Sequence, residues 1–345
     1  MITIRKYDIL WNELKFIRRL SGCWIGKDGI YMRSKRMRRS IIRRVLQFIP
    51  VLLGITFLAF LLIYLSPSDP VSVRMSAGGI SVSPEIMESM RRSMGLDRPL
   101  LIQYGDWLWN ILHGNMGKSY ITDADVLDQI LKALPYTLKM AGASLLLTLC
   151  ISIPVGILTA AMQNSKFDYV VRVMAFVGNA LPNFIIALCL MFIFSYRLVW
   201  IPVLATTKPI GLVLPAFTLA LVMSSRYIRQ IRAAMLDELS KGYVVGLRSR
   251  GLSETTILYK NALKNIMVTV ITLTGISLGS LLGGTVIVET VFTWPGLGSL
   301  IMEGISQRDY PVVQAVIVWM ASAFMVVNLL TDISYTVFNP KIKDI

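Results

Sequence analysis

The sequence predicts an all-α membrane protein with six membrane-spanning helices. Of its 345 residues, 54% are hydrophobic and only 16% are charged, and the mean hydropathy is +0.62. A soluble domain carries about a quarter charged residues. Several apolar runs also approach the roughly 20 residues that cross a bilayer as a helix. Composition and run length together therefore place most of the chain in a membrane.

The predicted spans form one isolated helix followed, after a long interval, by five that come in quick succession. We expect them at residues 45–65, 136–162, 173–196, 211–225, 266–288 and 312–338. The third contains Pro182, which predicts a kink because proline removes a backbone hydrogen bond. The carbonyl group that a kink frees must be satisfied within protein or water.

Residues 1–36 are predicted to be an N-terminal cytoplasmic extension. Trp11, Leu14 and Ile17 are spaced like one face of a helix that could lie on an anionic membrane surface. The alternative is a poorly ordered extension upstream of a start at Met37. The basic segment 33–44 leads into the first span without a small-residue cleavage site, so we expect a retained anchor and not a signal peptide.

Residues 37–134 are predicted to hold the first span and an extracytoplasmic region with helices at 84–94 and 103–112. The aromatic residues of the second helix suit the membrane interface. Gly117-Lys118-Ser119 has the form of a P-loop ending, but Leu112 stands where that pattern requires glycine. We therefore expect no nucleotide site in this chain.

The charges predict the orientation. Residues 33–44, the turn at 166–172 and residues 226–264 are basic, whereas the region 71–134 carries seven acidic residues. The positive-inside rule then places both termini and the loop after the fourth span in the cytoplasm. Topology thus accounts for the net charge of +15, and no nucleic-acid partner is expected.

The cytoplasmic loop 241–265 predicts a short helix, a glycine break and a second helix that runs into the membrane. Gly251 supplies the positive φ that ends the first helix. Ser253 is the expected N-cap of the second, and Glu254 lies in its first turn, where a carboxylate suits the helix dipole. Such an element, held between two spans, can receive force from a soluble partner.

Two segments resemble the permease subunits of ABC importers, most closely the dipeptide, oligopeptide and nickel branch. In the loop the matching residues are Tyr243, Val244, Arg248, Gly251, Leu252, Ser253, Ala262 and Asn265. After the fifth span they are Glu289, Trp294, Pro295, Gly296, Gly298, Asp309, Tyr310 and Pro311. Gly242, Leu247 and Thr269 depart from the loop pattern, where an acidic residue, alanine and proline are usual.

The resemblance implies a type I ABC importer permease fold, with a five-helix core at 135–345, in the cell membrane of a prokaryote. The implied partners are a second homologous permease, two ABC ATPase subunits at the loop, a substrate-binding protein and membrane lipid. No catalytic, cofactor or metal residue is implied in this chain, which is then no enzyme itself. The substrate would be a peptide or similar small solute, with nickel or a metal chelate as further candidates.

Small residues at helical spacing in the fifth span predict a close helix–helix contact. Gly275, Gly279 and Gly283 lie four residues apart, and glycine lets two backbones approach closely. The partner helix could belong to the same subunit or to a second permease.

Other functions remain as alternatives. An ion-coupled secondary transporter normally carries ionisable residues in the middle of its spans, and these are almost absent here. A membrane enzyme would need histidine or paired carboxylates within the spans, and the single histidine is His113 outside them. A purely structural anchor does not account for the loop pattern.

Overall fold

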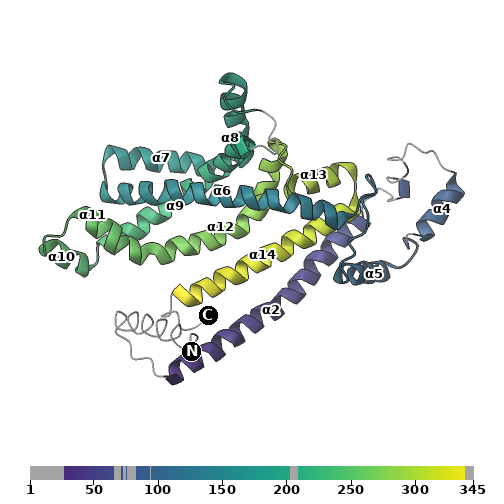
Figure 1. Cartoon of the computed structure of the whole chain (residues 1–345), viewed down its shortest axis with the longest axis horizontal. Helices are drawn as coiled ribbons and strands as arrows, with labels where there is room; N and C mark the ends of the chain where they lie inside the picture. Colours follow the sequence, from purple (N-terminus) through teal and green to yellow (C-terminus); the bar gives the residue numbers. More distant parts are fainter. Residues whose placement is uncertain are drawn as a thin grey trace, which may run out of the picture. The chain divides into compact units, whose positions relative to one another are not determined.

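The computed structural model describes residues 27–65, 71–72, 75, 83–93, 95–202 and 209–338. The proposed surface helix near the N-terminus lies outside these residues. The chain divides into two compact units, Met1–Gln47 and Phe48–Ile345. The described residues form helices joined by turns and loops, as Figure 1 shows. One isolated bridge pairs Lys118 with Asp125.

The helices are numbered as in Figure 1. They are α2 (Lys27–Tyr64), α4 (Pro84–Ser93), α5 (Leu100–Leu112), α6 (Val126–Ala161), α7 (Lys166–Ala180), α8 (Asn183–Leu190), the π-helix η1 (Met191–Arg197), the 3₁₀ helix η2 (Pro209–Leu212), α9 (Val213–Leu239), α10 (Gly242–Ser249), α11 (Glu254–Thr256), the π-helix η3 (Ile257–Ala262), α12 (Leu263–Val291), α13 (Leu297–Gln307) and α14 (Tyr310–Phe338). Among the described residues, five helices are long and apolar enough to cross a membrane, and α7 with α8–η1 could make a sixth span.

The second span begins ten residues earlier than its sequence suggests. We expected 136–162, after Pro135, but α6 starts at Val126 and runs through that proline. Asp125 caps the start, since its carboxylate accepts from the backbone N–H of Leu127 at 2.8 Å and of Asp128 at 3.3 Å. Ile130 is fully buried against α13 and α14. Tertiary packing and a cap therefore extend the helix beyond its apolar run.

The third span is broken, not merely kinked. Helix α7 ends at Ala180, α8 begins at Asn183, and the two are bent by 106°. Pro182 causes this break, because its ring disfavours the helical conformation in Leu181, which has an extended ψ of 132°. The predicted kink at this proline is thus confirmed, and its size exceeds the prediction.

Helix α7 is fastened to α9 by a buried ion pair. Arg232 donates from Nε and Nη2 to the two carboxylate oxygens of Asp168, at 2.7 and 2.8 Å. Asp168 also accepts from the backbone N–H of Asn164 at 3.1 Å. Two-pronged pairing of this kind satisfies a carboxylate that has no access to water.

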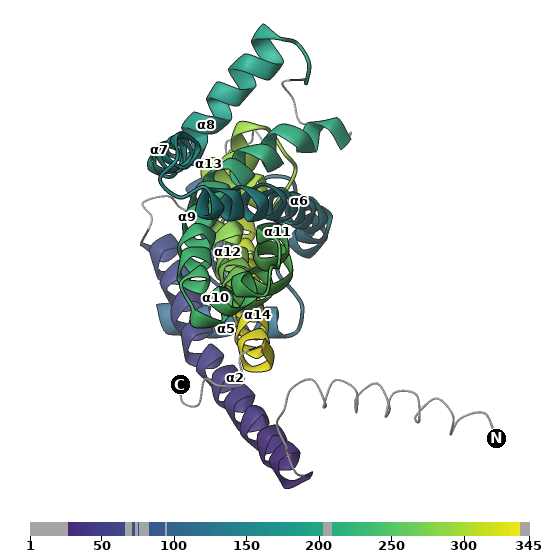
Figure 2. The same cartoon turned by 90° about the vertical axis from the view of Figure 1, so that its left-hand side faces the viewer.

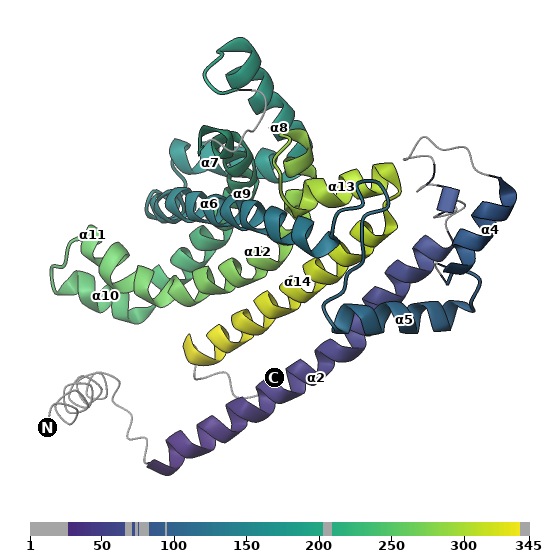
Figure 3. The ribbon, with the colours of Figure 1, turned by 45° about the vertical axis from the view of Figure 1, so that its right-hand side comes forward.

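The core consists of α6, α9 and α12, with α14 on α12 and α13 against α6, α12 and α14. Figures 2 and 3 show α6, α9 and α12 lying side by side. One apolar cluster joins α6, α9 and the start of α12 around Ile157, Ile231 and Ile266. A second surrounds Trp294 near the end of α12. The first cluster packs against the start of α12, and the second packs against its end.

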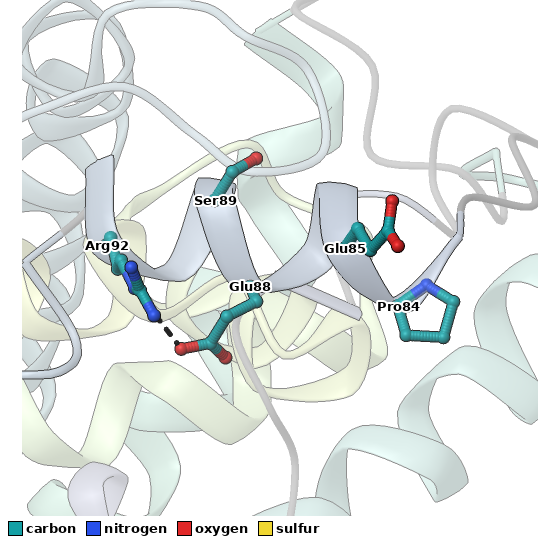
Figure 4. A pocket seen from close by; sticks show the side chains of 5 residues that line it. All are labelled: Pro84, Glu85, Glu88, Ser89 and Arg92. Carbon is teal, nitrogen blue, oxygen red and sulfur yellow. Dashed lines mark ion pairs between the residues drawn. The ribbon is translucent and has the colours of Figure 1, made fainter.

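Helix α4 carries a shallow, open depression of about 600 Å³ on its surface. It is lined by Pro84, Glu85, Glu88, Ser89 and Arg92, as Figure 4 shows. All five residues belong to this one helix, and Arg92 pairs with Glu88 at 3.5 Å. The depression is thus a feature of a single helix surface and does not join several elements.

Candidate functional site

The 241–265 element forms a short helix, a tight turn and a second helix that continues into α12. Gly251 has a φ of +77°, in the left-handed region that favours glycine. Ser253 then caps α11, since its hydroxyl oxygen accepts from the N–H of Thr256 at 3.4 Å. The helix–glycine–helix shape and the cap predicted from the sequence are both confirmed.

An ion pair joins the two helices across this turn. Arg248 of α10 donates from Nε and Nη2 to the carboxylate of Glu254, at 2.6 and 3.2 Å. The hydrogen bond to this carboxylate raises the pKa of the Arg248 guanidinium. Both side chains are about half exposed, so the pair contributes little stability. The pair joins the two helices at the surface, and the backbone conformation of Gly251 shapes the turn between them.

A buried carboxylate fastens the element to both neighbouring spans. Glu238, 5% exposed near the end of α9, accepts from the Tyr243 hydroxyl at 2.7 Å and from Asn265 Nδ2 at 2.7 Å. Lys241 Nζ donates to the same carboxylate at 2.5 Å. We call these four residues the Glu238 cluster. It connects α9, α10 and the start of α12 through one acceptor group.

Two members of the cluster, Tyr243 and Asn265, are residues that the sequence singled out, but Glu238 was missed. A signal for it exists, because the buried residues Tyr227, Ile231 and Met235 share one face of α9. Glu238 continues that face three residues further, where a charged residue is unexpected. Burial, and then the hydrogen bond donated to Glu238, raise the pKa of the Tyr243 phenol, which therefore stays a donor.

The apolar run of α10 divides between the interior and the surface. Val244 is fully buried within this chain, whereas Val245 is 59% exposed. The outward residues of the helix and its turn are Gly242, Tyr243, Val245, Gly246, Arg248, Ser249, Arg250 and Gly251. Val244 and Ala262 thus hold the element in place, and Leu252 is half-buried. Only the outward residues can meet another protein.

The second motif is built around Glu289, a fully buried carboxylate at the end of α12. Its Oε1 accepts from the Thr137 hydroxyl at 2.8 Å, and its Oε2 accepts from the N–H groups of Gly298 and Ser299 at 2.6 and 3.2 Å. The N–H of Leu297 donates to Thr137 Oγ1 at 2.8 Å. These bonds satisfy the unpaired donors at the start of α13, where a carboxylate also suits the dipole.

The remaining motif residues support this cap. A Cβ atom on Gly296 would collide with Glu289 and Thr137, and one on Gly298 would collide with Val286. Trp294 is buried and donates from Nε1 to the carbonyl oxygen of Tyr136 at 3.0 Å.

The end of the motif ties the start of α14 to the loop before α6. Asp309 accepts from the Ser119 hydroxyl and from the N–H of Tyr120 at 3.0 Å. Tyr310 is buried and Pro311 half-buried, whereas Pro295 is exposed. The motif therefore acts first as a rigid connection among α6, α12, α13 and α14.

The three glycines spaced four residues apart on α12, Gly275, Gly279 and Gly283 (the glycine stripe), face two different environments. A Cβ atom on Gly275 would collide with Thr331, and one on Gly279 would lie 2.9 Å from Phe324 Cε2. Both neighbours belong to α14, so these contacts form within the same subunit. Gly283, in contrast, is exposed and has no neighbouring atom within 4 Å of an added Cβ. The stripe thus does not act as one interface.

Two family models match the chain. The model described as "Binding-protein-dependent transport system inner membrane component" matches residues 152–344, and the model of the corresponding N-terminal component matches residues 37–141. Together they include both motifs and the first span.

Similar proteins match along nearly their whole length. The chain is 38% identical over 318 residues to the oligopeptide transport system permease protein AppB of Bacillus subtilis. The aligned region covers 89% of this chain and 100% of that protein. It is 34% identical over 307 residues to the glutathione transport system permease protein GsiC of Salmonella typhi (89% and 99%). It is 32% identical over 329 residues to the dipeptide transport system permease protein DppB of Alkalihalophilus pseudofirmus (87% and 98%).

A solved structure shares the fold. The chain superposes on a structure titled "Inward facing conformations of the MetNI methionine ABC transporter" with a TM-score of 0.51 at 19% identity. The match covers 61% of this chain and 95% of that one. The chain therefore shares the fold of an ABC transporter permease, as the sequence predicted.

Proposed function

We propose that an ATPase subunit drives the import of a peptide by acting on the 241–265 element of this chain. The chain belongs to the binding-protein-dependent transport system inner membrane components. The chain is a permease subunit of an ABC importer and a multi-pass protein of the inner membrane. Its family works together with ATPase and substrate-binding components. The proposal concerns how this subunit meets them and what it carries.

The observation that carries the proposal is the attachment of the 241–265 element. One buried carboxylate, Glu238, holds α10 to the end of α9 and to the start of α12. A push on the outward face of α10 then moves both spans, because the element cannot swing independently of them. A loop without such an attachment would absorb the same displacement by bending.

The partner at this face is an ABC ATPase subunit. The exposed residues Val245, Ser249 and Arg250 offer one apolar side chain, one hydroxyl group and one positive charge. A second permease pairs with this one, and each permease engages one of two ATPases. Both termini and the element then lie in the cytoplasm, because residues 33–44 and 226–264 are basic. The substrate-binding protein delivers its cargo from the opposite side.

Transport follows an alternating-access cycle. Closure of the ATPases on ATP displaces the two elements together and opens the path toward the binding protein. Hydrolysis, which takes place entirely in the partner subunits, returns the spans to the inward-facing state. The permease supplies the path and the mechanical connection, and its residues take no chemical part in the hydrolysis.

A peptide is the substrate that we propose. Relatives that are 32–38% identical over almost the whole chain are named for oligopeptide, dipeptide and glutathione transport. All three cargoes are chains of amide-linked amino acids. A nickel ion shares none of that chemistry, so a peptide takes precedence over the nickel alternative.

Cysteine crosslinking tests the docking face. In a chain whose native cysteines are replaced by serine, Val245→Cys should crosslink to an ATPase subunit in the assembled complex. Gln307→Cys, which is exposed at the end of α13, is the matched control and should not crosslink to it. If Val245→Cys forms no crosslink although a soluble thiol reagent labels it freely in the complex, the docking proposal is wrong.

Uptake of radiolabelled peptides by reconstituted complex tests the substrate. We expect ATP-dependent accumulation of at least one di- or oligopeptide, with no accumulation when a proton gradient replaces ATP. Uptake driven by the gradient alone would instead support a secondary transporter.

A further inference from the structure

Helix α5 (Leu100–Leu112) presents an apolar surface that none of the described residues covers. Leu101, Trp109 and Leu112 are 70%, 65% and 71% exposed. Trp109 and Leu112 follow Leu101 by 8 and 11 residues, a spacing that places all three on one side of a helix. Three large exposed apolar side chains on one short helix require an explanation.

The second side of α5 is packed on α2. The Tyr104 hydroxyl donates to the carbonyl oxygen of Leu53 at 3.3 Å and lies 2.9 Å from Thr56 Oγ1. The Tyr104 ring meets Phe57 edge-on with centroids 5.3 Å apart, and Trp107 lies 5.8 Å from the Phe60 ring. Figure 3 shows α5 lying across α2.

The third side of α5 is polar and tied to the preceding turn. Gln103 Nε2 donates to the carbonyl oxygens of Leu96 and Arg98 at 3.1 and 2.7 Å. Asp106 accepts from Arg98 Nη1 at 2.8 Å. The helix is therefore amphipathic, and its apolar and polar sides are clearly separated.

The position along α2 of the residues that contact α5 indicates how deep in the membrane α5 lies. The apolar span of α2 is Arg44–Tyr64, which at 1.5 Å per residue is about 30 Å long and matches the hydrocarbon core. The residues that touch α5 run from Leu53 to Phe60, which is about 6–16 Å before the end of this span. Helix α5 therefore lies at a depth where lipid, not water, surrounds α2.

We propose that α5 is an interfacial helix whose Leu101–Trp109–Leu112 side lies among the acyl chains of the leaflet opposite Arg44. Leu58 and Leu62 of α2 at this depth are 58% and 71% exposed, so this part of α2 also presents apolar side chains to lipid. The polar side of α5 and the turn before it then face the headgroups. Trp109 suits such a boundary, because its ring is apolar and its N–H is polar. In this position α5 anchors the segment between the first and second spans at the membrane surface.

Spin-label accessibility tests the proposal on the complete complex in liposomes. The native cysteines are replaced by serine, and nitroxides are attached at Leu101→Cys and Leu112→Cys on the apolar side or at Asp106→Cys and Asn110→Cys on the polar side. Collisions with oxygen report lipid, and collisions with a water-soluble chromium complex report water. We expect the oxygen-to-chromium ratio to be higher at residues 101 and 112 than at residues 106 and 110.

Two outcomes would overturn the proposal. Frequent chromium collisions at all four positions would place α5 in water. Protection of residues 101 and 112 from both reagents would mean that a second permease or the binding protein covers this side. ATP-dependent uptake is measured separately for each labelled complex. Retained uptake verifies that the labelled chain is correctly assembled, whatever the accessibility of its spin label.

Discussion

Gly251 determines the shape of the 241–265 element through its backbone conformation. Its φ of +77° is strained for residues with a Cβ atom, although no neighbour lies within 4 Å of that position. Gly251→Val should therefore cost about 1–3 kcal/mol in conformational strain without any collision. We expect normal insertion but less substrate transported per ATP hydrolysed, measured in reconstituted complex.

Gly251→Asn is the matched control, because asparagine tolerates the left-handed region far better than valine. It should retain coupling close to that of the natural chain. Equal coupling in the valine and asparagine variants would mean that the turn geometry is unimportant.

Gly298 tests the cap on α13. An added Cβ atom would collide with Val286 and lie 2.7 Å from Glu289 Oε2, the atom that accepts from the start of α13. Gly298→Ala should lower stability by about 1–3 kcal/mol through overpacking. Thermal unfolding of the solubilised subunit measures this, with Gly283→Ala as the control at a site where this chain leaves open space. Similar melting temperatures for both variants would contradict the described packing.

At the scale of elements, the Glu238 cluster is the connection between α10 and the spans. Glu238→Gln keeps the side-chain shape but removes the charge that accepts three hydrogen bonds. The two part-buried bonds from Tyr243 and Asn265 are each worth about 1.5–3 kcal/mol as hydrogen bonds to a charged group. The exposed bond from Lys241 counts for less. We expect ATP hydrolysis to continue while uptake falls, since α10 then moves without its spans.

Asp237→Asn, at the adjacent carboxylate outside the cluster, is the control for this experiment. Tyr243→Phe removes the hydrogen bond to Glu238 and the one that the Tyr243 hydroxyl accepts from Asn265 Nδ2 at 3.2 Å, and it should give an intermediate loss of coupling. If Glu238→Gln and Asp237→Asn behave alike, the cluster has no part in transmitting force.

The contact between α12 and α14 allows two interfaces to be separated. Gly279→Leu should disturb packing against Phe324 within this chain, which limited proteolysis of the solubilised subunit detects. Gly283→Leu adds the same group where this chain leaves open space. If a second permease packs on that side, only Gly283→Leu should reduce recovery of the permease pair without loosening the subunit. Equal effects in both assays would show that the two glycines are not distinct.

At the scale of the whole molecule, the path of the α7–α8–η1 segment decides how the chain crosses the membrane. With a bend of 106° it is either one broken span or a re-entrant hairpin. Only a complete crossing gives six spans and keeps the basic segments on one side. We therefore expect Gln163→Cys to be labelled from the cytoplasm and Leu198→Cys from the opposite side.

Impermeant thiol reagents applied to intact cells and to inverted vesicles make this measurement. Labelling of both positions from the same side would mean a re-entrant hairpin with five crossings. The two termini would then lie on opposite sides of the membrane.

The sequence by itself determined those properties that depend on neighbouring residues. The apolar runs predicted the spans, Pro182 predicted a kink in the third, and Gly251 with Ser253 predicted the turn and cap of the 241–265 element. The two motifs identified the permease family, which the matches along the chain confirm. Conformational preferences and hydropathy act over a few residues, so they are readable without a structure.

Only the tertiary structure decided which side chains meet across long stretches of chain. Thr137 and Glu289 are 152 residues apart in sequence, and neither by itself indicates that together they cap α13. Glu238 acquires its role from Asn265, 27 residues later, and Val244 is buried although its neighbour Val245 is exposed. Helix α6 begins before its apolar run because α13 and α14 bury its first turns. Burial and hydrogen-bond pairing between distant segments depend on how the helices pack, and local sequence patterns carry no information about that packing.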